Sequence, residues 1–388
     1  MKYLMILVIC LNLYAVELKN FNKLEFMYGS SSGTVLGNDI EAEGHRIILN
    51  TYNDIIFNKY VTINSTINYT SRSEIYSRSY NKIRPAENYF EISELDLNIF
   101  ITPDDIISVG NFSFKNGVFS EHSTAGLKLS DALMTFYYIN MTGVFYTHYI
   151  NENHKIQFGY GARIDDIYQL PEDRYENSRN GSDIGYLFTK SVIDKHTFRI
   201  NASVSNIIYE KIYDEETLES LGNLYFAGVG YQYDDRDTSG MVYYGIAGVS
   251  VTDFDGTEIS PTGTALEGPG INFSDEGKRT GYSVLVGAKK DFDANIFRLD
   301  SYFGAEYFYA SKHWISYATD LENINAYSWG NLGNTFKVYT GIYVTPKIKL
   351  GVTGRYEQID YAKLSGGNSV TPIDDESFRY CIRLDILF

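Results

Sequence analysis

The chain has 388 residues and a formal net charge of −16, which argues against nucleic acid and anionic membrane surfaces as electrostatic partners. Mean hydropathy is slightly polar at −0.23, although 15% of the residues are aromatic and 35 of them are tyrosines. Beyond the first residues, no run approaches the ~18 to 20 continuous apolar residues that a membrane helix needs. These features argue against a helical membrane protein and against a nucleic-acid-binding protein.

The first fifteen residues have the layout of a secretory signal peptide. Lys2 supplies the positive charge, an apolar stretch follows it, and Ala15 is a small residue at which cleavage could occur. Cys10 raises a lipoprotein alternative, but the residue before it is not the small residue which that signal requires. Cleavage leaves one domain over residues 16–388, in which Cys381 is the only cysteine and no internal disulfide can form.

The mature chain alternates apolar and polar side chains with a period of two. This predicts β-strands, because successive strand residues point to opposite faces. Adjacent aromatic pairs, such as Tyr225-Phe226 and Tyr243-Tyr244, suit the aromatic girdles of a membrane barrel. The expected strands cover residues 19–30, 45–57, 61–73, 90–101, 106–115, 136–150, 155–165, 183–193, 196–209, 223–233, 241–254, 280–290, 296–310, 335–345, 347–361 and 376–388.

Long and short connections alternate between these strands. The first long one is a Gly- and Ser-rich loop at residues 31–43, whereas tight turns such as 58–60 and 103–105 connect the other strand ends. This asymmetry, with strands of roughly ten to fifteen residues, is typical of tilted strands that cross a bilayer. We therefore predict an all-β fold, a transmembrane antiparallel β-barrel of about 16 strands (roughly 14–18), with short periplasmic turns and long extracellular loops.

The last strand ends on an aromatic residue and has an apolar side chain at every second position before it. This row consists of Phe378, Tyr380, Ile382, Leu384, Ile386 and Phe388. The pattern resembles the C-terminal strand of Gram-negative outer-membrane β-barrels, with an amphipathic strand of a soluble sheet as the alternative. The resemblance implies that the barrel assembly machinery reads this strand. It also implies that the protein lies in the cell outer membrane, among lipids and lipopolysaccharide.

A barrel of this size favours a pore, because about 16 to 18 strands enclose an aqueous channel whereas eight leave a filled interior. Polar positions on the strands, among them Arg163, Arg355 and Arg383, are expected to line the lumen. The stretch from Val109 to Glu121 resembles the segment of several porin families in which a strand leads into a loop.

The porin resemblance implies that the connection formed by residues 116–135 folds into the barrel and narrows it. Acids on this loop would face bases on the wall, and the resulting transverse field would orient polar solutes. The alternatives are that Asp131 caps a short helical turn and that the two wall arginines lie at a solvated rim. The residues expected at the constriction are Glu121, His122, Asp131, Arg46 and Arg72.

The sequence contains no catalytic motif, so we expect neither enzymatic activity nor a resident cofactor. Outer-membrane phospholipases carry a His with a Ser two residues on, whereas His148 is followed by Tyr149 and Ile150. The acidic stretch 253–258 lacks the spacing of a calcium-binding loop. A solvated turn is expected there, with a weakly bound Ca2+ in an extracellular loop as the alternative.

These patterns and the resemblance predict an outer-membrane porin through which small hydrophilic solutes and ions diffuse passively. The resemblance also suggests a homotrimer. Two alternatives stay open. One is a structural or adhesive barrel with a plugged lumen, and the other is a surface-facing barrel enzyme that hydrolyses lipids.

Overall fold

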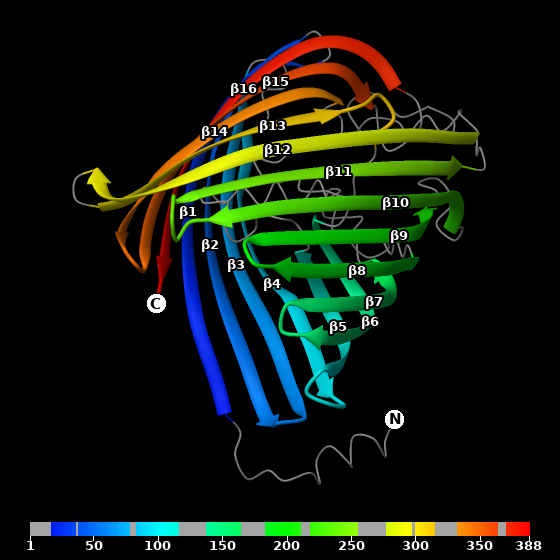
Figure 1. The fold of residues 1–388 in the computed structure, drawn as a ribbon. Coiled ribbons are helices and arrows are strands. Elements are labelled where there is room, and N and C mark those ends of the chain that lie inside the picture. The colour runs from blue at the N-terminus through cyan, green and yellow to red at the C-terminus, as the bar shows by residue number, and fades with distance from the viewer. Residues whose placement is uncertain are drawn as a thin grey trace.

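The computed structural model of the chain is a closed barrel of antiparallel strands. In the part of the chain that it describes, each of sixteen strands pairs with the next along the sequence, and β16 pairs back with β1 (Figure 1). These described residues contain no helix that is long and apolar enough to cross a membrane. The structure describes residues 17–35, 38–77, 83–115, 137–163, 183–210, 218–254, 277–296, 299–314, 332–363 and 370–388.

The strands range from 10 residues in β7 to 21 residues in β2. The predicted fold and the predicted number of strands are confirmed. The strands are β1 (Glu17–Val35), β2 (Asn38–Asn58), β3 (Val61–Ser77), β4 (Ile83–Phe100), β5 (Asp105–Lys115), β6 (Tyr137–Asn151), β7 (His154–Arg163), β8 (Asp183–Ile193), β9 (His196–Glu210), β10 (Leu218–Asp235), β11 (Met241–Phe254), β12 (Gly277–Ile296), β13 (Leu299–Ala310), β14 (Leu332–Thr345), β15 (Ile348–Lys363) and β16 (Val370–Leu387).

The two ends of the barrel differ in how the strands connect. At one end, which we call the turn end, consecutive strands are joined by short turns such as residues 59–60, 152–153 and 194–195. At the opposite end, the loop end, longer segments such as 255–276 join the strands. Short turns gathered at one end are the asymmetry that the sequence predicts.

The first connection at the loop end differs from the prediction. The sequence predicts a loop at residues 31–43, but β1 continues to Val35 and β2 begins at Asn38. On β1, residues 31–33 are paired along both edges, since Gly33 lies opposite Ile40 on β2 and opposite Ser377 on β16, and the next two residues continue the pairing with β2. Backbone pairing on both sides can hold a strand whose small side chains give no apolar pattern. The prediction of a long loop here is therefore wrong.

The terminal strands close the barrel. Their register runs from Lys23 opposite Leu387 to Gly33 opposite Ser377. At the turn end, the amide of Phe388 donates to the carbonyl of Asn22 at 3.0 Å, and the reverse bond measures 2.9 Å. The last residue of the chain thus belongs to the ladder, and the described strands leave no open sheet edge.

Successive side chains alternate between the outside and the inside of the barrel. On β10, Tyr225 is 43% exposed and Phe226 is 3% exposed; on β11, the values are 47% for Tyr243 and 4% for Tyr244. The adjacent aromatic pairs therefore do not contribute two rings to a girdle, because one ring of each pair faces inward. Outward rings instead meet across strands.

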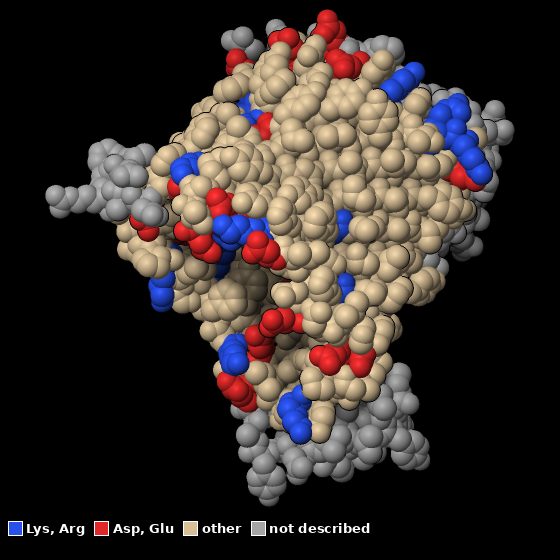
Figure 2. Space-filling model, viewed as in Figure 1, with Lys and Arg blue, Asp and Glu red and all other residues tan. Residues whose placement is uncertain are grey.

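The outer surface of the barrel is apolar. Exposed side chains on it include Phe198 and Ile200 on β9 and Val229 and Tyr231 on β10, and the rings of Phe198 and Tyr231 lie 5.3 Å apart. Figure 2 shows that the surface over β8–β13 is largely free of charged side chains, which gather towards its margins. Such a band is what a bilayer requires of a spanning barrel.

The predicted row on the last strand faces this apolar exterior. Phe378, Tyr380, Ile382 and Phe388 are exposed, whereas Cys381 between them is buried on the inner face. Leu384 and Ile386 continue the same row and are half-buried. The role of this row as an assembly signal stays a prediction.

Candidate functional site

The inner face of the barrel carries most of the buried charged side chains. A buried charge is stable only with partners that replace its lost hydration. The partners of these charged side chains differ between regions of the barrel wall, and we use this difference to locate the candidate site. The buried charged residues on the inner face are Glu25, Asp96, Arg199, Lys289, Glu306, Lys337, Arg355, Glu357, Asp375, Arg383 and Asp385.

The region formed by β13–β16 and β1, which we call the paired wall, holds several of its buried charges in ion pairs. Glu306 on β13 lies opposite Lys337 on β14, and Lys337 Nζ is 2.7 Å from Glu306 Oε2. The hydroxyl of Tyr244 donates to Glu306 Oε1 at 2.5 Å and lies 3.1 Å from the hydroxyl of Tyr339. Both oxygens of this buried carboxylate are therefore satisfied by donors.

A second group of paired charges joins β15 to β16. Glu357 Oε1 lies 3.1 Å from Arg355 Nη2, and Glu357 Oε2 lies 3.3 Å from Arg379 Nε. The hydroxyl of Ser377 also donates to Oε2, at 2.7 Å. One carboxylate thus serves two guanidinium groups, and the cluster fixes the positions of both strands.

A third group spans the closing seam of the barrel. Arg383 Nη2 on β16 is 3.0 Å from Glu25 Oε2 on β1, and Arg383 Nε donates to Asp385. Lys23 forms an ion pair with Glu25 as well. Because these contacts link the first strand to the last, they stabilise the closed state of the barrel.

The region formed by β7–β9 is different. Lys155 on β7 lies opposite Lys190 on β8, which in turn lies opposite Arg199 on β9. We call these three residues the basic row. Lys155 Nζ lies 5.4 Å from the centre of the Phe188 ring. Among the described residues, Lys155 and Lys190 have no ion-pair or hydrogen-bond partner.

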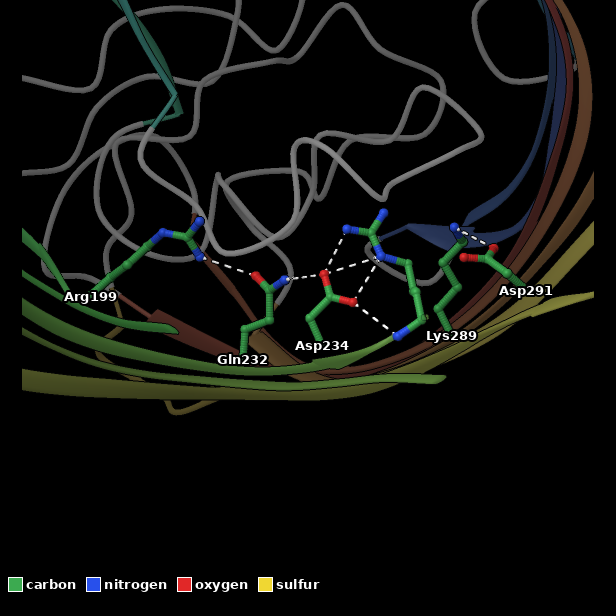
Figure 3. A network of polar contacts seen from close by, with 6 residues as sticks. Arg199, Gln232, Asp234, Lys289 and Asp291 are labelled. Carbon is green, nitrogen blue, oxygen red and sulfur yellow. Dashed lines mark hydrogen bonds and ion pairs between the residues drawn. The ribbon is translucent and has the colours of Figure 1, made fainter. Parts of the chain in front are cut away.

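Arg199 is linked to a short polar chain on the next strand (Figure 3). Its Nη1 donates to Gln232 Oε1 at 3.4 Å, and Gln232 Nε2 donates to Asp234 Oδ2 at 3.5 Å. Asp234 is itself ion-paired to Arg236 at 2.6 Å. The acid of this chain is thus neutralised by its own arginine. Figure 3 also shows a separate ion pair on β12, formed by Lys289 and Asp291. Lys289 Nζ lies 2.7 Å from Asp291 Oδ1.

Two acids on β4, Glu94 and Asp96, are held by hydrogen bonds. Thr66 on β3 donates to Glu94 Oε2 on β4 at 2.8 Å. Asn64 on β3 donates to Asp96 Oδ2 at 3.3 Å, and Asn98 donates to the same oxygen. Neutral amides and hydroxyls therefore surround these carboxylates.

An apolar stripe also runs along the inner face, from β10 to the loop end of β14. Its residues are Phe226, Val242, Tyr244, Ile246, Leu285, Phe308, Ala310, Trp314 and Leu332. Trp314 belongs to no strand. The amide of Ser311 still donates to the carbonyl of Tyr282, at 2.9 Å, and the chain then turns inward, with the amide of Trp314 bonded to the carbonyl of Ser311.

The inward turn of residues 311–314 depends on two glycines in neighbouring strands. The ring of Trp314 packs edge-on against Phe226, with ring centres 5.1 Å apart. A Cβ added at Gly281 would lie 2.2 Å from the backbone of His313 and Trp314, and one at Gly248 would lie 2.7 Å from Trp314 Cη2. Only glycine leaves room for this segment inside the barrel.

The residues predicted to form the constriction or to line the lumen fall into three groups. Glu121, His122 and Asp131 lie outside the described residues, as does the rest of the predicted inward loop, 116–135. Arg46 and Arg72 are opposite each other on β2 and β3, and Arg46 is half-buried. Arg163 is the last residue of β7, whereas Arg355 and Arg383 belong to the ion pairs of the paired wall.

Reasoning from the sequence placed Arg199 among the inward polar positions, but it did not single out Lys155, Lys190 or Trp314. Arg199 lies nine positions after Lys190 in the sequence, and Lys155 is more distant still, so only the strand register shows that they are neighbours. The inward position of Trp314 depends on glycines in two other strands. A signal for the basic row was nevertheless present, since all three residues occupy inward positions near the short turns.

The acidic stretch at the loop end of β11 is described only in part. Asp253 Oδ2 lies 3.1 Å from Lys278 Nζ on the neighbouring strand, and residues 255–258 lie outside the described ranges. In the part of the chain that the structure describes, no group of three His, Cys, Asp or Glu residues is placed to hold a metal ion. A weak calcium site in the loops stays a prediction.

Comparison with known families gives one match. The family model described as "Protein of unknown function (DUF3373)" matches residues 117–373, which is more than half of the chain. No curated protein matches the sequence.

Solved structures with the same architecture share little sequence with this chain. The trimer form of in-vitro folded OmpT, an outer membrane protein of Vibrio cholerae, is 11% identical and aligns over 96% of this chain and 100% of its own, with a TM-score of 0.53. OprB of Pseudomonas putida at high pH is 11% identical, with 96% and 94% covered and a TM-score of 0.54. OmpF of Salmonella typhi in complex with daunomycin is 13% identical, with 96% and 98% covered and a TM-score of 0.52. These similarities show a porin-like barrel fold.

Proposed function

The chain belongs to the DUF3373 family of proteins of unknown function, and we propose that it forms a water-filled channel across the outer membrane for small hydrophilic solutes and ions. The observation that carries this proposal is the contrast between the two faces of one closed sixteen-stranded barrel. The outer face is apolar, whereas charged and hydrogen-bonding side chains line much of the inner face. Barrels of about 16 strands are wide enough to enclose an aqueous channel.

Unpartnered hydroxyl and amide groups on the inner face support a wet interior. Ser203 and Ser205 on β9, Asn68 on β3 and Thr353 on β15 each have a buried oxygen with no hydrogen-bond partner among the described residues. Native proteins seldom leave such groups unsatisfied, and water is their usual partner where protein groups are lacking. A lumen lined by these groups suits polar solutes better than apolar ones.

The surroundings of the channel follow from its fold and its terminal segments. We propose that residues 1–15 direct export and are removed, and that the outward row ending at Phe388 is read by the barrel assembly machinery. Lipids and lipopolysaccharide would then contact the apolar exterior. A homotrimer is part of the proposal and is supported by the similarity to the trimer form of OmpT. No chemical step is proposed for this chain.

A second candidate function is a barrel whose lumen is blocked. The inward turn at residues 311–314 favours it, because Trp314 is buried inside the barrel and packs across three strands. Such a barrel would serve as a structural or adhesive element rather than a channel. The two candidates differ in whether ions pass.

Conductance of the folded protein in a planar lipid bilayer distinguishes these functions. Repeated ohmic current steps from purified protein would support the channel. Folding of the same sample is checked by its resistance to protease and by its heat-dependent migration in gels. Folded protein that inserts into the bilayer and gives no current steps would overturn the channel and support the blocked barrel.

A further inference from the structure

We infer that the basic row, Lys155, Lys190 and Arg199, is a binding site for a small oxyanion on the wall of the lumen. The ligand would be a solute that carries a phosphate or carboxylate group. This inference deepens the proposed function, because it names the class of solute that the channel would hold on its way through. Binding itself can be measured whether or not the barrel conducts.

The three side chains of the basic row lie on the inner face. On β7, Phe158 and Tyr160, three and five positions after Lys155, are exposed on the outer face, and on β9 Phe198 and Ile200 have the same orientation. Alternation then directs positions 155 and 199 inward. Position 190 shares their face, because it is the register partner of both. The row is thus continuous over three neighbouring strands.

Like charges at directly opposite positions of an antiparallel pair destabilise the sheet. The basic row contains two such pairs in succession, Lys155 with Lys190 and Lys190 with Arg199. No described acid forms an ion pair with either lysine. On the paired wall, by contrast, Lys337 and Arg383 have carboxylate partners at 2.7 and 3.0 Å. An external anion would give the basic row the negative charge that carboxylates give to the cations of the paired wall.

The neighbouring groups leave the positive charge of the row in place. On one side, Gln157 donates to Thr147 at 3.1 Å, and both residues are neutral. On the other side, Gln232 lies between Arg199 and Asp234, whose charge is already balanced by Arg236 (Figure 3). Gln232 accepts from one nitrogen of Arg199, which restrains the guanidinium group against the wall.

The donors of the row suit an oxyanion. Lysine ammonium groups and a guanidinium group together can satisfy several oxygens of one phosphate or carboxylate, in charge-assisted hydrogen bonds. Towards the loop end, four and six positions after Arg199 on the inner face of β9, Ser203 and Ser205 have buried hydroxyl oxygens with no partner among the described residues. At about 3.3 Å per residue, these hydroxyls lie roughly 13 and 20 Å further along the strand, where a passing polar solute would meet them as neutral hydrogen-bonding groups.

Calorimetric titration of the full-length folded protein tests this inference. Inorganic phosphate, succinate and acetate are titrated separately into protein in a non-ionic detergent at low salt. Saturable binding of phosphate alone would indicate a phosphate-type ligand, and binding of the carboxylates alone would indicate an organic acid. Either result supports an oxyanion site, and the absence of saturable binding of all three would overturn it.

Two double variants locate the site. In K155Q/K190Q, the affinity for the bound anion should fall at least about tenfold, because two charge-assisted contacts are lost. The matched control is K59Q/K347Q, which removes two exposed lysines at turns and the same net charge. The control should bind like the original protein. Equal affinity in both double variants would overturn the assignment of binding to the row.

Conductance of the same samples separates this inference from the proposed channel. Current steps without saturable anion binding would leave the channel standing and overturn the binding site. Anion binding that K155Q/K190Q abolishes, without current steps, would leave the site standing and overturn the open channel. Gel migration of each variant confirms that the barrel is folded.

Discussion

The paired wall and the basic row show two opposite arrangements of charge on the inside of one barrel. In the paired wall, Glu306, Glu357 and Glu25 each accept contacts from basic groups at 2.7 to 3.3 Å. In the basic row, three cations lie opposite one another, and two of them have no ionic partner among the described residues. The first arrangement stabilises the barrel. The second opposes folding, which is what a binding site can do when its ligand is absent.

This comparison predicts that similar substitutions in the two regions change the free energy of unfolding in opposite directions. Removing one member of a buried ion pair leaves an uncompensated charge, so the barrel loses stability. Removing one member of the basic row relieves repulsion, so the barrel gains stability. Four substitutions test both directions, and their expected effects on the free energy of unfolding decrease from Glu306→Gln to Lys190→Gln.

The largest effect is expected for Glu306→Gln. Lys337 is 2% exposed and would lose its carboxylate partner, so the variant should be less stable by about 3–5 kcal/mol. Urea-induced unfolding of the barrel in lipid vesicles measures this change. Glu152→Gln, at an exposed turn position, is the control and should stay within about 0.5 kcal/mol of the original protein. A loss below 1 kcal/mol in Glu306→Gln would contradict the importance of the paired wall.

Trp314→Ala should have the next largest effect. The substitution removes a buried ring from its contact with Phe226, and we expect the free energy of unfolding to fall by about 3 kcal/mol. This value is at the low end for such a truncation, because the turn packs against one side of the barrel wall. Single-channel conductance should rise as well, since the ring lies inside the barrel. Unchanged conductance in a folded variant would show that the inward turn does not limit the current.

Gly281→Ala tests whether close packing against β12 holds the same turn in place. The added methyl group would lie 2.2 Å from the backbone of His313, so the turn must move, at a cost of about 1–3 kcal/mol. Gly354→Ala is the matched control, because its added methyl group would lie 3.8 Å from the nearest atom, a side-chain carbon of Val338. If both variants behave alike in urea unfolding and in conductance, close packing at Gly281 does not hold the turn.

The smallest effect, and the only gain, is expected for Lys190→Gln. Lys190 faces a cation on each side, so its neutralisation should raise the stability by about 0.2–1 kcal/mol for each repulsive pair. Urea unfolding at low salt measures the gain, which should shrink at high salt because mobile ions screen the repulsion. Loss of stability in this variant would indicate that Lys190 has a structural partner.

The fold could be predicted from the sequence because a barrel wall separates two media. A period of two in side-chain polarity located all sixteen strands, and it also oriented the row that ends at Phe388. The same reasoning failed at residues 31–43, where small and polar side chains hide a strand that is paired on both edges. Alternation reports the environment of side chains and gives no information on backbone pairing.

The candidate site was less accessible to this reasoning. Arg355 and Arg383 could be assigned to the inner face, but their carboxylate partners depend on register and on side-chain reach across strands. The basic row brings together residues from three strands. The inward position of Trp314 depends on space left by Gly248 and Gly281. Each of these features is a relation between strands, which a pattern along one strand does not contain.

The reversal potential of single channels under a potassium chloride gradient tests the central claim most directly. If the basic row supplies uncompensated positive charge to the lumen, K155Q/K190Q should shift the reversal potential towards cation preference, despite the unchanged loops. The control K59Q/K347Q should shift it much less, although its net charge changes equally. Identical reversal potentials in the two double variants would show that the basic row does not act on ions in the channel.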